Sequence, residues 1–216
     1  MSTSSATRPY HHGALRQALV AEALRVISEH GEAALSLRDL ARRLGVSHAA
    51  PYRHFATMDA LLAAIAEEGF ALLAADVERA VANEANPVEQ LGEAGWAYVR
   101  FALEHPHHFR VMFNGRLTGG DEFAGLQAAM SRSYAALLRT IEAGQVAGEI
   151  AGADVRELAT SAWVHVHGLA TLLLERQLGA ASLADSERIA RRAIEILICG
   201  LGIREGRAPE ARKRAL

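Results

Sequence analysis

The chain has 216 residues, of which 50% are hydrophobic and 22% are charged, with a formal net charge of −2 at pH 7. This composition supplies the core of one medium domain or two small ones and predicts a folded, soluble protein. A single cysteine, Cys199, excludes an intramolecular disulfide and favours a reducing compartment. No signal peptide and no membrane-spanning stretch is evident, so we expect a cytoplasmic protein.

The charge is divided unevenly along the chain. Residues 1–55 contain seven arginines against four acidic residues, which makes this part +3, and they hold half of the ten histidines. Residues 56–216 carry −5. A basic N-terminal part followed by an acidic remainder is the asymmetry expected when one end of a protein faces nucleic-acid phosphates.

Helical periodicity extends over nearly the whole chain, and no alternating run is long enough to predict a strand, so the fold class is all-α. The first predicted helix covers residues 15–30 and ends near Gly31. A short second helix follows Ser36, which we expect to act as its N-cap, with Asp39 placed to close a capping box. One face of this helix is apolar, formed by Leu37, Leu40, Ala41 and Leu44.

Gly45 accepts a positive φ, so the chain can turn sharply there before Ser47 caps a short third helix. Two short helices joined by a glycine turn predict a helix-turn-helix. Proline and glycine positions divide the remainder into further helices, predicted at residues 58–83, 88–104, 107–114, 121–147, 154–178 and 185–203.

The third helix ends in a Tyr-x-His-Phe string, formed by Tyr52, His54 and Phe55. Over about residues 10–62 the sequence closely resembles the TetR family of bacterial transcriptional repressors. Farther along, the string Trp-Val-His-Val-His-Gly at residues 163–168 is similar to the signature of the Trp-His-Gly group of TetR-type C-terminal domains. The resemblance implies a three-helix DNA-binding headpiece at residues 1–57, a helical effector-binding and dimerisation domain at 58–204, and a basic tail at 205–216.

A helix N-terminus that enters the major groove presents its first side chains to base edges. Here these side chains are Ser47, His48, Ala49 and Ala50. The resemblance implies that Tyr52 and His54 contact the sugar-phosphate backbone, together with Ser36 and the nearby Arg38, and charge adds Arg53. For Arg42 and Arg43 we favour a solvated helix face.

The sequence departs from the family pattern at two positions. Met58 stands where many relatives have a lysine that contacts phosphate, and Pro51 falls early in the third helix, where it cannot donate a backbone hydrogen bond. An arm with Arg8, His11 and His12 precedes the first helix and offers a compensating contact to DNA.

A single headpiece covers only a few base pairs, so a two-fold dimer with two headpieces is expected to bind a palindromic double-stranded operator. The last helix is apolar nearly all round, at Ile194, Ile196, Leu197, Ile198 and Leu201, and four leucines line the helix before it. In line with the family, we expect homodimerisation through residues 154–178 and 185–203 as an intermolecular four-helix bundle.

An effector site is expected among aromatic and methionine side chains of the C-terminal domain, with a few polar groups. The candidates are Trp96, Tyr98, His105, Phe109, Met112, Phe113, Met130, Tyr134, Trp163 and His167. For any one of them alone we favour an ordinary core position, and it is the set together with the family resemblance that favours an effector cavity. By analogy with the family, a small and largely apolar effector would release the DNA, and no cofactor is implied.

Two other classes of protein are compatible with parts of the sequence. A histidine-based metal enzyme would use residues such as His105, His107 and His108, or the pair His165 and His167, but the pair is two residues apart and points to opposite sides of a helix. Neither a zinc motif, a phosphate loop nor a nucleophile elbow is present, so no enzyme and no metal site are expected. A helical adaptor without DNA binding stays open because of Pro51 and Met58.

Overall fold

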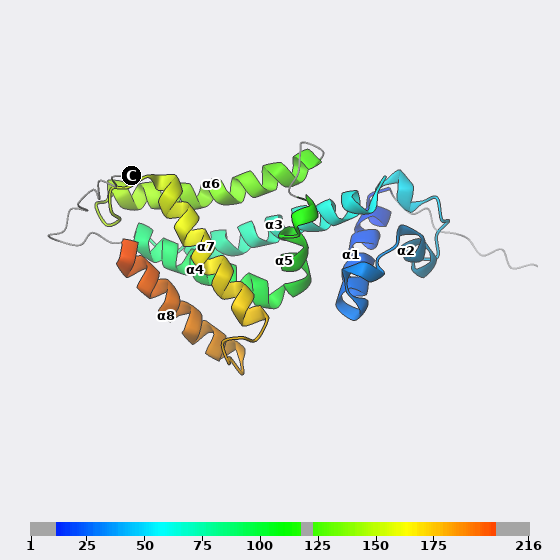
Figure 1. Cartoon of the computed structure of the whole chain (residues 1–216). Coiled ribbons are helices and arrows are strands. Elements are labelled where there is room, and N and C mark those ends of the chain that lie inside the picture. The colour runs from blue at the N-terminus through cyan, green and yellow to red at the C-terminus, as the bar shows by residue number, and fades with distance from the viewer. Residues whose placement is uncertain (1–11, 118–122, 202–216) are drawn as a thin grey trace, which may run out of the picture. The chain divides into compact units, whose positions relative to one another are not determined.

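The computed structural model describes residues 12–117 and 123–201, and these residues form eight α-helices, three short 3-10 helices and no strand (Figure 1). The all-α prediction is therefore confirmed. The chain divides into two compact units. Unit 1 contains the residues up to Leu72 and residues 105–131, and unit 2 contains residues 73–104 and those from Arg132 onward.

Unit 1 is built from the headpiece and from parts of the chain that follow it. Its elements are α1 (His12–His30), η1 (Glu32–Ala34), α2 (Leu37–Arg43), η2 (Pro51–Arg53), the first part of α3 (Met58–Val81), α5 (Pro106–Met112), η3 (Gly115–Leu117) and the first part of α6 (Ala124–Val146). The predicted division at residue 57 does not coincide with this unit, because α5 and the start of α3 belong with the headpiece. The assignment of residues 1–57 as the DNA-binding domain stays a prediction.

Local signals set the element ends in the headpiece. Helix α1 ends at His30 because Gly31 adopts a φ of +80°, and Gly45 turns the chain after α2 with a φ of +67°. Leu19 on α1 and Leu40 on α2 are almost completely buried, and these two helices contact one another; Leu61 at the start of α3 is buried as well. The predicted arm residues Arg8, His11 and His12 lie outside the described side chains.

Unit 2 is organised around α4 (Pro87–Glu104), which contacts both α7 (Val155–Leu174) and α8 (Leu183–Leu201). Gly92 and Gly95 on α4 allow close packing of α8, since a Cβ at Gly95 would lie 3.2 Å from Ile194 Cδ1. Asp154 caps α7 by accepting hydrogen bonds from the backbone N–H groups of Arg156 and Glu157 at 2.9 and 3.0 Å.

The prediction that the helix starting at residue 154 extends to residue 178 is wrong. It ends at Leu174, because Arg176 takes a left-handed conformation with a φ of 57°. The N–H groups of Arg176 and Gln177 then donate to the carbonyls of Leu173 and Leu172, a Schellman closure without glycine. None of the helices in residues 12–117 and 123–201 has the length and apolar character needed to cross a membrane.

Candidate nucleic-acid interface

The recognition segment, residues 47–54, is not the regular helix that the sequence predicts. Residues 48–50 form a turn, and a 3-10 helix follows at Pro51–Arg53. The N–H of Ala50 donates to the carbonyl of Ser47 at 2.9 Å, and the N–H of His54 donates to that of Pro51 at the same distance. Ser47 does not cap this helix, whose N-cap is Ala50, and Pro51 supplies no N–H for an α-helical bond at its own position.

Two apolar side chains of this region hold the recognition segment on the headpiece core. Pro51 is almost completely buried, and Phe55, four residues later, is 3% exposed, with the Arg16 guanidinium 5.5 Å from its ring centre. The sequence predicts Pro51 only as a disturbance of the helix, whereas its burial makes it an anchor of the segment. The four-residue spacing of Pro51 and Phe55 is the signal that could have indicated it.

The side chains predicted to contact DNA lie on the outside of the same segment. Ser47, His48, Ala49 and Arg53 are exposed, and Ala50 and His54 are half-buried. Tyr52 is 54% exposed, which rules out the alternative that its ring packs in the headpiece core. The segment therefore presents polar and small side chains outward while Pro51 and Phe55 point inward.

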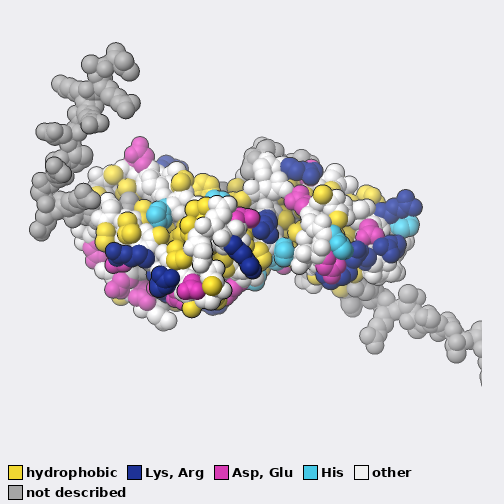
Figure 2. All heavy atoms as spheres, turned by 60° about the horizontal axis from the view of Figure 1, so that its bottom comes forward, with side chains coloured by type: hydrophobic (Ala, Val, Ile, Leu, Met, Phe, Trp, Pro, Cys, Tyr) yellow, Lys and Arg dark blue, Asp and Glu magenta, His cyan; other side chains and the backbone are white. Residues whose placement is uncertain are grey.

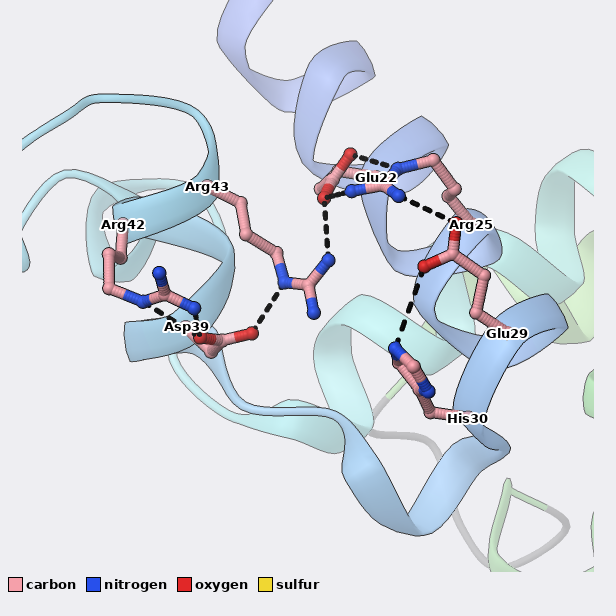
Figure 3. A network of polar contacts seen from close by, with 7 residues as sticks. All are labelled: Glu22, Arg25, Glu29, His30, Asp39, Arg42 and Arg43. Carbon is pink, nitrogen blue, oxygen red and sulfur yellow. Dashed lines mark hydrogen bonds and ion pairs between the residues drawn. The ribbon is translucent and has the colours of Figure 1, made fainter.

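The capping box predicted at the start of α2 is not formed. Ser36 has the extended backbone of an N-cap, but its side chain makes no capping hydrogen bond. The carboxylate of Asp39 is bound instead by Arg42 at 2.6 Å and by Arg43 at 2.6 Å, as Figure 3 shows. Arginines three and four residues farther along the helix bind this carboxylate, and it therefore makes no hydrogen bond to the backbone at the start of the helix.

The polar network of Figure 3 links α2 to α1. Arg43 lies 3.6 Å from Glu22, and Arg25 binds both Glu22 and Glu29 at 2.6 Å. The hydrogen bonds from Arg25 hold the pKa of Glu22 below its ordinary value, and those from Arg43 do the same for Asp39. Arg42 is exposed, as the predicted solvated face requires, and Arg43 is half-buried; both arginines are ion-paired there.

Much of the positive charge of the headpiece is consequently neutralised. Arg25, Arg42 and Arg43 pair with carboxylates, whereas Arg38 and Arg53 are exposed and form no ion pair within residues 12–117 and 123–201. Figure 2 shows basic and histidine side chains at the headpiece end, at the right of the view. No carboxylate of the described residues therefore neutralises Arg38 or Arg53, and the same holds for Arg16, which lies over the Phe55 ring.

The residues predicted to bind an effector divide between the two units. His105, Phe109, Met112, Phe113 and Met130 belong to unit 1, and the other five belong to unit 2. In unit 1 the rings of Phe109 and Phe113 are 5.0 Å apart, and Phe70 lies 5.7 Å from Phe113. The Met112 side chain lies against Gly69, and a Cβ at position 69 would come within 2.5 Å of the Met112 sulfur. The absence of a side chain at Gly69 therefore allows α5 to pack closely on α3.

In unit 2, three of the predicted residues form a hydrogen-bonded group between α4 and α7. The Tyr98 hydroxyl lies 2.9 Å from His167 Nδ1 and is also hydrogen-bonded to Trp163. Because an indole N–H can only donate, the Tyr98 oxygen accepts from Trp163 and its proton goes to His167 Nδ1. Burial raises the pKa of Tyr98 and lowers the pKa of His167, so both groups are neutral near pH 7.

The other two residues of unit 2 lie elsewhere. Trp96 packs under Arg191, at 5.7 Å from its ring centre, and the Tyr134 hydroxyl lies 3.2 Å from Thr160 Oγ1. Trp96 lines a surface hollow of about 450 Å³ together with Arg79, Ala80, Glu93, Arg100, Leu183, Glu187 and Arg191. This lining is mostly charged, unlike the apolar cavity that the sequence suggested.

The paired histidines of α7 do not face one another. His165 Nε2 lies 3.1 Å from the carbonyl oxygen of Ala193 on α8, whereas His167 contacts Tyr98 on α4. Their two-residue spacing predicted this separation, and the two rings serve different helix contacts.

Comparisons with known proteins agree with this arrangement. Residues 19–65 match the family described as bacterial regulatory proteins, tetR family, and residues 91–197 match the tetracyclin repressor-like C-terminal domain. The chain belongs to the TetR family. Like other TetR proteins, it is a DNA-binding, ligand-responsive transcriptional regulator and not an enzyme, and members of the family act as dimers.

Several solved structures share the fold over most of the chain. A protein of unknown function from Rhodococcus sp. RHA1 is 35% identical, with a TM-score of 0.80 over 91% of this chain and 100% of that one. A tetR-family regulatory protein from Rhodococcus RHA1 is 25% identical, with a TM-score of 0.70 over 88% and 98% of the chains. PfmR, a TetR-family regulator from Thermus thermophilus, is 25% identical, with a TM-score of 0.67 over 85% and 98%. No curated protein matches the chain.

Proposed function

We propose that the protein is a repressor that binds a palindromic operator as a homodimer and is released by a small, largely apolar effector. The observation that carries the proposal is the recognition segment, where Ser47, His48, Ala49 and Tyr52 are exposed while Pro51 and Phe55 are buried. A segment that packed its polar side chains inward could not reach a DNA groove.

The contacts to DNA divide by chemistry. Ser47 and His48 offer hydrogen-bonding groups to base edges, and the methyl groups of Ala49 and Ala50 fit close to a thymine methyl. Arg38 and Arg53 pair with phosphates, while Ser36, Tyr52 and His54 donate hydrogen bonds to the sugar-phosphate backbone. Few polar atoms thus read bases, and phosphate contacts supply most of the affinity.

The homodimer forms through α7 and α8, within residues 154–178 and 185–203. Val164 and Leu172 on α7 are 58% and 39% exposed, and Ile196 on α8 is 58% exposed. Between the two α7 residues lies Gly168, above which the space is open. Figure 2 brings the α8 side of unit 2 forward and shows exposed apolar side chains there. Burial of such a surface against a second copy is favourable; the side chain of Leu201 lies outside the described residues.

The effector contacts aromatic residues of α4 and α7 within unit 2. There the hydrogen-bonded group of Tyr98, Trp163 and His167 supplies polar atoms beside aromatic rings. The candidates Phe109 and Phe113 form a separate apolar group in unit 1. A mainly apolar ligand with one or two polar groups matches this chemistry.

Selection of bound duplexes from a random library tests the DNA-binding part of the proposal. We expect a palindrome whose half-sites are about one DNA turn apart, with binding that weakens steeply as salt is raised. If the full-length protein retains no duplex at low ionic strength and elutes from heparin without strong salt dependence, the helical adaptor replaces the repressor.

Release by an effector is tested separately with the selected duplex. A panel of apolar compounds is titrated while DNA binding and the fluorescence of Trp96 and Trp163 are followed. A compound that weakens DNA binding and changes the fluorescence, but leaves that of a Trp163→Phe variant unchanged, supports the proposed site. A panel that never alters DNA binding contradicts this part of the proposal.

A further inference from the structure

Asn114 lies between α5 and η3, and both the amide nitrogen and the amide oxygen of its side chain are hydrogen-bonded. Its amide nitrogen donates to both carboxylate oxygens of Glu32 at 2.9 Å, and its amide oxygen accepts from the backbone N–H of Arg116 at 3.1 Å. Glu32 belongs to η1 in the headpiece, 82 residues earlier. The amide orientation is therefore determined by its two partners, an acceptor on one side and a donor on the other.

Arg116, two residues later, binds the headpiece region at a second point. Its guanidinium lies 2.7 Å from the carboxylate of Asp59, in the first turn of α3, and 3.9 Å from that of Glu32. Glu32 lies just before α2, and Asp59 lies just after the recognition segment. The whole helix-turn-helix thus lies between two chain positions that are both bound by residues 114–116.

The short segment that carries these two side chains is itself fixed within unit 1. Met112 is packed against Gly69, and Phe113 lies against Phe70, so the end of α5 is seated on α3 by apolar contacts. Polar bonds from this seated segment to Glu32 and Asp59 then restrict both ends of the helix-turn-helix.

We propose that Asn114 and Arg116 are positioning residues for DNA recognition, which form with Glu32 and Asp59 a clamp that holds both chain ends of the helix-turn-helix. The proposal rests on the proposed function in so far as the recognition segment reads DNA. The clamp residues are partly exposed, with Arg116 at 59% of its side chain, so their loss changes the placement of the helix-turn-helix more than the stability of the protein.

Asn114→Asp is the sharpest test, because it keeps the size of the side chain and its bond to the N–H of Arg116 but places a carboxylate against Glu32. Asn86→Asp is the matched control in unit 2. Asn86 likewise donates to a glutamate, Glu149, at 2.8 Å, while its amide oxygen accepts from the N–H of Val88 at 2.7 Å. The double variant Glu32→Gln/Asn114→Asp reverses donor and acceptor and restores the bond.

Hydrogen exchange of the full-length protein without DNA is measured first. We expect Asn114→Asp to speed exchange in residues 46–57 about tenfold, with Asn86→Asp unchanged there and the double variant near wild type. Affinity for the duplex selected by the wild-type protein is expected to fall about tenfold in Asn114→Asp and to recover in the double variant.

Arg116→Met separates positioning from direct phosphate contact. A positioning role weakens DNA binding without changing its salt dependence, whereas a phosphate contact lowers the slope of log K against log salt by about one. Unchanged exchange in residues 46–57 of Asn114→Asp, or such a fall in the slope for Arg116→Met, overturns the proposal. If the wild-type protein selects no duplex, the proposed function fails, and the exchange comparison alone still decides whether the clamp exists.

Discussion

The hydrogen-bonded group between α4 and α7 gives a prediction whose size follows from its geometry. Tyr98→Phe removes one oxygen and leaves the ring, so no cavity forms, but the Trp163 indole loses its acceptor and His167 Nδ1 its donor at 2.9 Å. Each net hydrogen bond contributes about 1 kcal/mol, so the free energy of unfolding should fall by about 1 to 2 kcal/mol. In a chain of this length that corresponds to a Tm lower by about 2 to 8 °C.

Urea unfolding of the two variants Tyr98→Phe and Tyr134→Phe measures the effect. Tyr134 is the control, because its hydroxyl makes only longer contacts, at 3.2 Å to Thr160 and 3.3 Å to the Arg156 carbonyl, and its loss should cost less than about 0.5 kcal/mol. A second arm adds His167→Leu to Tyr98→Phe, which removes both partners, so the two effects should be less than additive. Equal losses for the two tyrosines, or strictly additive effects, would refute the assigned hydrogen bonds.

The remaining predictions concern DNA, dimer and pH. Tyr52→Phe should weaken binding to the selected duplex about three- to tenfold at unchanged Tm, since Tyr52 is 54% exposed in the free protein. Equal affinity in a mobility-shift assay removes Tyr52 from the interface. Gly168→Leu should weaken dimerisation at least about tenfold, as measured by sedimentation equilibrium, because the α7 helix of the second copy is proposed to pack in the open space above Gly168. An unchanged dimerisation constant contradicts that interface. Burial lowers the pKa of His167 in the folded state, so the unfolded chain takes up the proton first as pH falls. The stability that this group contributes is therefore complete above its ordinary pKa of 6.5 and is lost as pH falls below that value. The free energy of unfolding should therefore decrease from pH 7.5 to pH 5.5 and decrease less in His167→Gln; identical decreases in the two proteins would show that His167 does not titrate in this way.

Signals within a few residues determined the helices and their order. Gly31 ends α1 and Gly45 turns the chain after α2, as the sequence predicts, because a positive φ is a property of the residue itself. The start of α3 after Thr57 and of α4 near Asn86 follow equally local rules, since each of these side chains accepts a hydrogen bond from an N–H of the first turn. The exposed positions of Ser47, His48 and Tyr52 likewise agree with the prediction for the DNA-reading surface.

Competition between neighbouring groups decided what the local rules left open. Asp39 could have capped α2, but Arg42 and Arg43 bind its carboxylate. Pro51 is buried in a 3-10 helix that packs against α1 and α2. The effector candidates are all aromatic, methionine or histidine residues and cannot be told apart in the sequence, but the folded chain places five of them in unit 1 and five in unit 2.

Contacts between distant residues depend entirely on the tertiary structure. Asn114 meets Glu32 across 82 positions and Arg116 meets Asp59 across 57, and neither pair follows a helical or turn spacing. Periodicity encodes which side of an element is apolar, whereas the partner that a polar side chain finds is set by which elements pack together. The sequence by itself therefore determined the α-helices and which headpiece side chains are exposed, whereas the recognition segment as a turn and a 3-10 helix, and the bonds from residues 114–116 to Glu32 and Asp59, depended on tertiary packing.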